Sequence, residues 1–276
     1  MTDLLRIEGL SIAPVAQPSR MLVNDVSLTL QSGRTTCIVG ESGSGKSLTA
    51  LSVMGLLSPA LQRTSGKIVF QGTEISAYSH RDMQDIRGKR IGMIFQEPMT
   101  SLNPVLTVGF QIGESLATHL GLKGAALQTR IGDLLEQVGI PPARAGSYPD
   151  ELSGGQRQRV MIAMSIACQP AMLIADEPTT ALDVTVQAQI LSLLADLKQR
   201  MQMGMLFITH DFGVVADIAD DVVVMFRGQV VESGPVDQVL GRPAHPYTRA
   251  LLDCVPDAEG LKALKPIDYA WLKEGV

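Results

Sequence analysis

A glycine-rich loop carries the strongest chemical signal in the sequence. Residues 40–47 read Gly-Glu-Ser-Gly-Ser-Gly-Lys-Ser and fit the pattern G-x-x-x-x-G-K-[ST], between the β-branched run Thr36–Val39 and a helical spacing. Glycines let successive N–H groups point inward, and the helix start adds a positive dipole end, so the loop predicts an anion cradle for phosphates. The residues expected to bind the nucleotide here are Gly40, Glu41, Ser42, Gly43, Ser44, Gly45, Lys46, Ser47 and Leu48.

Two consecutive carboxylates supply the second half of such a site. Asp176 and Glu177 follow the apolar run Met172–Ala175. Asp176 is expected to bind Mg²⁺ together with the Ser47 hydroxyl, whereas Glu177 is expected to polarise an attacking water. An Asp-Glu pair after a strand is otherwise often a solvated turn or a helix N-cap. The phosphate loop favours the catalytic interpretation.

A second helix start suited to phosphate lies in the middle of the chain. Leu152–Gln156 reads Leu-Ser-Gly-Gly-Gln and precedes a helical stretch over Arg157–Cys168. Ser153, Gly154 and Gly155 therefore predict another helix N-terminus that can face an anion. The two phosphate-binding ends need not meet within one subunit, because the second can close over the nucleotide of a partner.

The elements that must position these residues follow an α/β pattern. Short apolar runs alternate with longer helical spacings, which is typical of a mostly parallel sheet covered by helices. The expected strands are Thr36–Val39, Ile91–Phe95, Met172–Ala175, Met205–Thr209 and Val222–Met225, and helical spacing recurs over 127–138 and 186–197. The first 35 residues alternate in short segments and predict an antiparallel β layer. Strand signals disappear between Pro98 and Ser153, where we expect an inserted helical lobe.

Composition excludes several classes of protein. The 276 residues include 45% hydrophobic residues and carry 23 Lys+Arg against 28 Asp+Glu, for a net charge of −5. This is an ordinary globular balance, which argues against disorder and against a general nucleic-acid binder. Three cysteines without metal-ligand spacing favour a reduced interior. The start lacks the pattern of a secretory signal, and the longest apolar run, Val222–Phe226, is too short to span a membrane.

Taken together and in this order, the motifs resemble those of the nucleotide-binding subunit of ATP-binding-cassette (ABC) transporters, from about residue 5 to 250. The matching elements are Gly40–Ser47 (Walker A), Gln96 (Q-loop), Leu152–Gln156 (signature), Asp176 and Glu177 (Walker B and catalytic base), 181–183 (D-loop) and His210 (switch histidine). The resemblance implies a RecA-like P-loop NTPase fold, with an ABC ATPase domain over 1–240 and a helical lobe over about 98–158.

The same resemblance assigns roles to individual residues. Gln96 would sense Mg²⁺ and the lytic water and link them to the helical lobe, and His210 would contact the γ-phosphate. Asp183 would help two subunits to register. Ser153, Gly154, Gly155 and Gln156 would bind the nucleotide of the opposite subunit, while Lys46 and Glu177 serve catalysis.

Two further segments resemble the peptide and nickel uptake branch of this family. Phe95–Pro104 is similar to its extended Q-loop, and His245–Leu252 is similar to the start of its C-terminal extension, here 241–276. Many relatives continue into a cysteine-bearing segment proposed to hold an iron–sulfur cluster. Only Cys254 is present here, so no cluster is expected. His245 has no His or Cys partner spacing and is interpreted as a loop residue rather than a nickel ligand.

The resemblance implies an ATPase that uses ATP and Mg²⁺ to power import, with dipeptides or oligopeptides as the first choice of substrate and nickel as the second. Its implied partners are two transmembrane permease subunits, a second ATPase subunit in a head-to-tail homo- or heterodimer, and a periplasmic or surface substrate-binding protein, with no nucleic acid. The implied location is peripheral, at the cytoplasmic face of the inner membrane. The alternative of another class is a soluble ABC ATPase acting on nucleic acid or the ribosome.

Two observations refine this interpretation. Asn24 and Asn103 are the only asparagines, and neither begins an Asn-Lys-x-Asp guanine motif, which argues against a GTPase. Related proteins stack adenine on an early aromatic residue, yet no aromatic precedes Phe70, and the expected region reads Ser-Ile-Ala-Pro over 11–14. Base stacking contributes about 1–3 kcal/mol, so adenine selectivity is expected to be weak or supplied by a neighbouring subunit.

Overall fold

The computed structural model describes residues 3–96, 101–180 and 182–254. The chain divides into two compact units, one formed by residues 1–76 and 207–276 and the other by residues 77–206. The phosphate loop and His210 belong to the first unit. Gln96, the signature residues and the Asp-Glu pair belong to the second.

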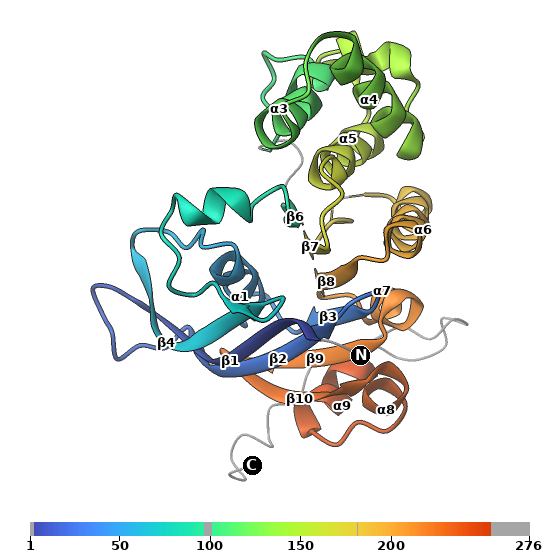
Figure 1. Ribbon diagram of the computed structural model, residues 1–276. Helices are drawn as coiled ribbons and strands as arrows, with labels where there is room; N and C mark the ends of the chain where they lie inside the picture. Colours follow the sequence, from blue (N-terminus) through green and yellow to red (C-terminus); the bar gives the residue numbers. More distant parts are fainter. Residues whose placement is uncertain (1–2, 97–100, 181, 255–276) are drawn as a thin grey trace. The chain divides into compact units, whose positions relative to one another are not determined.

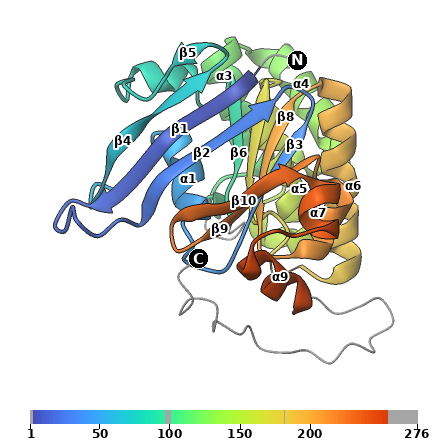
Figure 2. The ribbon, with the colours of Figure 1, turned by 90° about the horizontal axis from the view of Figure 1, so that it is seen from below.

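An antiparallel sheet of four strands forms one layer of the first unit. Its strands are β1 (Asp3–Pro14), β2 (Val23–Gln31), β4 (Leu61–Phe70) and β5 (Thr73–Glu74), in the order β2-β1-β4-β5. β1, β2 and β4 run side by side (Figure 2). The antiparallel layer expected from the first 35 residues is confirmed, but the structure adds β4 and β5. The polar run Gln62–Lys67 in β4 hides the strand from a search for apolar alternation.

The first unit also holds the strands and helices that surround the phosphate loop. β3 (Thr35–Val39) runs parallel to β9 (Asp221–Phe226), which pairs on its other edge with the antiparallel β10 (Gln229–Pro235) (Figure 1). All five residues of β3 are buried, as a strand covered on both faces requires. The helices of this unit are α1 (Lys46–Val53), α7 (Phe212–Ile218), α8 (Val236–Gly241) and α9 (Pro246–Asp253).

The second unit combines a parallel strand pair with four long helices. β6 (Ile91–Ile94) pairs with β7 (Met172–Asp176) in register from Ile91 with Met172. The helices are α3 (Val108–Leu120), α4 (Gly124–Gln137), α5 (Gly154–Ile166) and α6 (Val184–Met201), with 3₁₀ turns at Asp82–Asp85, Pro142–Gly146 and Pro149–Glu151. β8 (Gly204–Thr209) starts in this unit and ends in the first. The predicted α/β architecture with parallel strands is thus confirmed.

Close packing of α5 on β6 explains one glycine of the second unit. A Cβ at Gly92 would lie 2.2 Å from the carbonyl oxygen of Ser165, a contact that no side chain permits. Over 101–153 the structure contains helices and turns but no strand, as the sequence predicted. Pro98, the expected start of this helical stretch, lies outside the described residues. No helix in the described part of the chain is both long and apolar enough to cross a membrane.

Candidate functional site

The phosphate loop is built on glycine conformations that other residues rarely adopt. The φ angles of Gly40, Gly43 and Gly45 are +149°, +80° and +100°. A Cβ at Gly40 would lie 2.1 Å from the carbonyl oxygen of Met225, so the loop passes directly against β9. Gly45 is the N-cap of α1 in a left-handed conformation and contributes no side chain to the cap. The backbone start of α1 is therefore the feature presented to a ligand.

Two side chains of the loop place hydrogen-bond donors inside it. The Lys46 ammonium is buried and donates to the carbonyl oxygens of Gly40 at 2.8 Å and Glu41 at 2.9 Å. The Ser44 hydroxyl is also buried, and it has no hydrogen-bond partner among the described residues. A buried polar group without a partner costs about 1–3 kcal/mol. A phosphate oxygen can accept a hydrogen bond from either donor, so the loop fits the phosphate chain of a nucleotide.

Neighbouring segments of the first unit hold the loop from outside. Gly228, in the turn between β9 and β10, donates its N–H to the carbonyl oxygen of Ser44 at 3.1 Å. The Tyr247 hydroxyl oxygen accepts the N–H of Glu41 at 3.1 Å. Residues 41–44 line a small pocket of about 110 Å³ together with Phe226 and Arg227.

His210 is an exposed residue directly after β8. The next residue, Asp211, caps α7, because its Oδ1 accepts the N–H groups of Gly213 at 2.8 Å and Val214 at 3.4 Å. The end of a buried strand and a capped helix thus define the position of the His210 backbone.

The structure brings Gln96 and Glu177 together, two residues to which the sequence analysis assigned roles around the lytic water. Glu177 Oε2 accepts a hydrogen bond from Gln96 Nε2 at 3.2 Å and another from Thr180 Oγ1 at 2.9 Å. Glu177 has a left-handed backbone, with φ of +46°. Such a conformation costs about 1–3 kcal/mol in a residue with a side chain and is concentrated at functional sites. Asp176, the preceding residue, is buried at the end of β7.

Thr180 is a site residue that the sequence analysis missed. The turn that follows Glu177 is closed by the N–H of Thr180 donating to the carbonyl oxygen of Glu177 at 3.2 Å. A threonine three residues after a candidate base can reach back to it across such a turn. That spacing was the available signal.

The signature segment begins a helix, as predicted. Ser153 is the exposed N-cap of α5, and its Oγ accepts the N–H of Gln156 at 3.3 Å, while Gln156 Oε1 accepts the N–H of Ser153 at 3.1 Å. This reciprocal pair is a capping box. A Cβ at Gly155 would lie 2.8 Å from Cγ1 of Val186, so only glycine fits there without a shift.

Asp183 is the N-cap of α6, where its Oδ1 accepts the N–H of Val186 at 2.9 Å. Its carboxylate is exposed at the helix start. Ala181, the first residue of the expected D-loop, lies outside the described residues. In β1, Ser11, Ile12 and Ala13 are buried, so the region in which the resemblance places an adenine-stacking aromatic is part of the antiparallel sheet.

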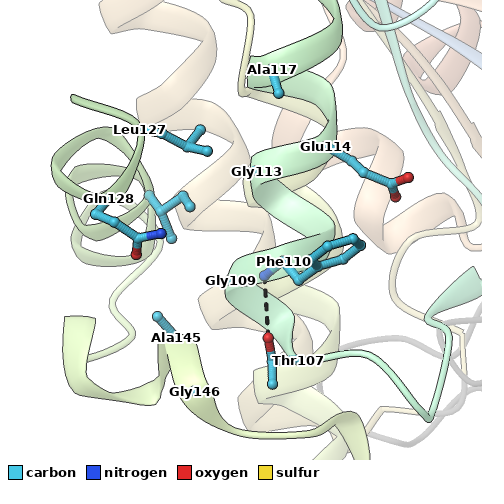
Figure 3. Close-up of a pocket in the computed structure, with 11 residues that line it drawn as sticks. Thr107, Gly109, Phe110, Gly113, Glu114, Ala117, Leu127, Gln128, Ala145 and Gly146 are labelled. Carbon is cyan, nitrogen blue, oxygen red and sulfur yellow. Dashed lines mark hydrogen bonds between the residues drawn. The ribbon is translucent and has the colours of Figure 1, made fainter. Parts of the chain in front are cut away.

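A separate pocket lies on the helices of the second unit. Phe110 and Glu114 project from α3, and Leu127 and Gln128 from α4 (Figure 3). The pocket has a volume of about 520 Å³ and is mainly apolar. Phe110 is 55% exposed although it is a large hydrophobic residue. None of its lining residues is among the predicted nucleotide-binding residues.

A glycine-rich loop after one parallel strand, and an Asp-Glu pair with a buried aspartate at the end of another, define a P-loop nucleotide-binding protein of the α/β class. The comparisons with known proteins identify the family. A family described as "ABC transporter" matches residues 23–180, and one described as "Oligopeptide/dipeptide transporter, C-terminal region" matches residues 231–270. The chain therefore belongs to the ABC transporter family and carries the C-terminal region of its oligopeptide branch.

Individual relatives agree with this assignment. The chain is 51% identical over 280 residues to the glutathione import ATP-binding protein GsiA of Escherichia coli O1:K1, covering 97% of this chain and 44% of that protein. The chain thus spans less than half the length of the curated relatives it matches. Among solved structures, CbiO1 of Clostridium perfringens, part of the ABC transporter complex CbiONQ, has a TM-score of 0.77 at 27% identity, with 88% of this chain and 92% of that one covered. The dimeric cassette MJ0796 bound to ADP and Pi has a TM-score of 0.75 at 26% identity, with 84% and 98% covered.

Proposed function

We propose that the chain is the ATP-hydrolysing subunit of an importer for dipeptides or oligopeptides. The match to the oligopeptide-transporter C-terminal region supports the importer class over a soluble ABC ATPase of nucleic acid or the ribosome. The similar proteins from Escherichia coli are glutathione import ATP-binding proteins, which supports a short peptide as substrate over nickel. In this assignment residues 1–240 form the ATPase domain, with its helical lobe over about 98–158, and residues 241–276 form the C-terminal extension.

Nucleotide binding is assigned to the phosphate loop. Lys46, the Ser44 hydroxyl and the N–H groups at the start of α1 bind and orient the phosphates and stabilise charge on the transferred phosphoryl group. Ser47 and Asp176 offer the oxygen ligands that Mg²⁺ prefers, and Gln96 completes this set. When bound, Mg²⁺ would supply positive charge that stabilises the phosphates. His210 contacts the γ-phosphate.

The local environment of Glu177 is the observation that supports hydrolysis, rather than nucleotide binding alone, as the function of the site. Its carboxylate is held by two donors, Gln96 and Thr180, on a strained backbone directly after the buried Asp176. In this setting the Glu177 carboxylate accepts a hydrogen bond from a water and orients its attack. Fixed orientation matters because catalysis of phosphoryl transfer consists mainly of positioning and electrostatic stabilisation.

A second ATPase subunit completes the proposed site. Ser153, Gly154 and Gly155 form an exposed helix N-terminus that can contact the nucleotide of a head-to-tail partner, and Asp183 is placed to register the two subunits. MJ0796, which has a similar fold, is dimeric with ADP and Pi bound. The peripheral location at the cytoplasmic face of the inner membrane follows from the importer assignment.

We assign the apolar pocket between α3 and α4 to a cytoplasmic segment of a permease subunit. Exposed aromatic surface beside an apolar pocket marks a contact site, and Phe110 provides it. Glu114 adds an exposed negative charge at the edge of the apolar lining. The complementary partner is an amphipathic helix with apolar residues facing Phe110 and Leu127 and a basic residue facing Glu114.

Substitution Glu177→Gln tests the proposed function. Glutamine has nearly the same shape and keeps an oxygen that can accept from Gln96 and Thr180, but it cannot act as a base. ATP binding is expected to persist, and the rate of hydrolysis is expected to fall by about 10²–10⁴-fold, which traps the ATP-bound dimer. The control Glu136→Gln, on the exposed face of α4, removes the same charge and should leave the rate unchanged. Wild-type hydrolysis by Glu177→Gln would overturn the assignment.

A further inference from the structure

A tyrosine of the C-terminal region touches the phosphate loop. Tyr247, in the first turn of α9, has no exposed surface. Its hydroxyl oxygen accepts the N–H of Glu41, 206 positions away in the sequence, at 3.1 Å. Its ring packs against Phe226 with 4.3 Å between centroids, and the Arg227 guanidinium lies 5.0 Å from the centre of the Phe226 ring.

The start of α9 is itself held in place by two hydrogen-bonded residues. Glu232 in β10 accepts the N–H of Ala244 at 2.7 Å and the N–H of His245 at 3.0 Å. His245, interpreted from the sequence as a loop residue, is the N-cap of α9, and its Nδ1 accepts the N–H of Tyr247 at 3.1 Å. Tyr247 is therefore anchored to β10 on one side while it bonds to the loop on the other.

Tyr247 contacts the loop at Glu41, a residue that also accepts a hydrogen bond from the Lys46 ammonium. Glu41 gives its N–H to Tyr247 and its carbonyl oxygen to Lys46 Nζ. Because a peptide group is planar, fixing the N–H of Glu41 fixes the carbonyl of Gly40, the other oxygen that Lys46 contacts. The Tyr247 hydroxyl thus orients the Gly40 carbonyl directly, and it holds the residue whose own carbonyl is the second acceptor for Lys46.

We propose that Tyr247 is a positioning residue for nucleotide binding, through which the C-terminal region sets the geometry of the phosphate loop. This inference rests on the proposed role of Gly40–Ser47 in binding ATP. The alternative is that Tyr247 only fills the core beside Phe226. A phenylalanine would fill that space equally well, so the hydroxyl alone separates the two explanations.

The experiment compares Tyr247→Phe with Ser27→Ala in the full chain. Ser27→Ala removes the same kind of bond, a hydroxyl accepting a backbone N–H, here that of Gly9 at 2.9 Å in the antiparallel sheet of the same unit. Binding of a non-hydrolysable ATP analogue is measured by calorimetry, ATP hydrolysis gives kcat and KM, and thermal unfolding reports folding. Lys46→Ala tests the loop itself.

Tyr247→Phe is expected to raise the Kd for the analogue and the KM for ATP by about five-fold, the effect of one hydrogen bond. The value of kcat should change less than about two-fold, because the loop holds the phosphates in the ground state and the transition state alike. Ser27→Ala should leave Kd and KM unchanged. A Kd for Tyr247→Phe equal to that of the wild type, or the same rise in Ser27→Ala, would overturn the inference. Undiminished binding by Lys46→Ala would instead overturn the proposed nucleotide site.

Discussion

Substituting Gly40 by alanine tests whether contact with β9 shapes the phosphate loop. The added Cβ would lie 2.1 Å from the carbonyl oxygen of Met225, about 1.3 Å short of the 3.4 Å at which ordinary contact begins. The two Met225 atoms that it would contact, the carbonyl oxygen and carbon, are backbone, so the loop or β9 must shift. The φ of +149° adds strain of about 1–3 kcal/mol for a residue with a Cβ. We expect a total loss of about 3–5 kcal/mol in the free energy of unfolding.

Gly43 provides the matched control three residues further along the same loop. Its φ is +80°, but an added Cβ would meet nothing within 4 Å. The free energy of unfolding of Gly43→Ala should therefore fall only by the cost of a left-handed conformation in a residue with a side chain, about 1–2 kcal/mol. Urea unfolding without nucleotide measures the stability of both variants. The urea concentrations at the unfolding midpoint are compared, provided that the dependence of the unfolding free energy on urea is the same. Equal midpoints for the two variants would refute the argument that the Met225 carbonyl limits position 40.

Other parts of the site make further predictions. Thr180→Val removes a donor to Glu177 Oε2, so kcat should fall about ten-fold with unchanged ATP affinity; unchanged kcat in an ATPase assay would contradict this. Phe110→Ala should reduce co-purification with the permease subunits without changing ATP binding, and full recovery of the complex would contradict the assigned docking pocket. Burial, with the charge of Arg249 adding to it and that of Glu232 opposing it, lowers the pKa of His245, so the folded chain favours neutral imidazole. Neutral His245 therefore contributes its whole stabilisation above about pH 6.5, the pKa of an unfolded histidine, and this contribution is lost as the pH falls through the lowered pKa of the folded chain. Asparagine can also act as an N-cap but does not titrate, so in His245→Asn the fall in Tm between about pH 7.5 and 5.5 should be smaller.

The sequence predicted the parallel strands because they are buried on both faces. β3 and β7 consist of residues that are all buried, and each appears as a short apolar run. β4 was missed for the opposite reason. Only two of its ten residues are buried, so its strand conformation comes from pairing with β1 rather than from its own hydrophobic pattern. β10, whose residues are all partly or fully exposed, was missed for the same reason.

The location of the candidate site was predictable where residue type and local spacing define it. The phosphate loop and the Asp-Glu pair are short motifs, and their immediate strand and helix context suffices to find them. Tyr247 could not be found this way, because its contact with Glu41 depends on how α9 packs after β10. His245 likewise gained its capping role from the helix that follows it.

The two proposed phosphate-binding helix N-termini differ in their capping, and this difference has a functional consequence. α5 carries its own cap, since Ser153 and Gln156 satisfy each other's N–H groups before any ligand binds. α1 begins at Gly45 without a side-chain cap, beside the buried Ser44 hydroxyl that lacks a partner among the described residues. Bound phosphate would therefore supply acceptors to a helix start that has no side-chain cap, and its binding would stabilise α1, whereas the capping box of α5 forms without a ligand. We expect ATP to protect the amides of α1 from hydrogen exchange in the isolated chain, with no comparable change in α5.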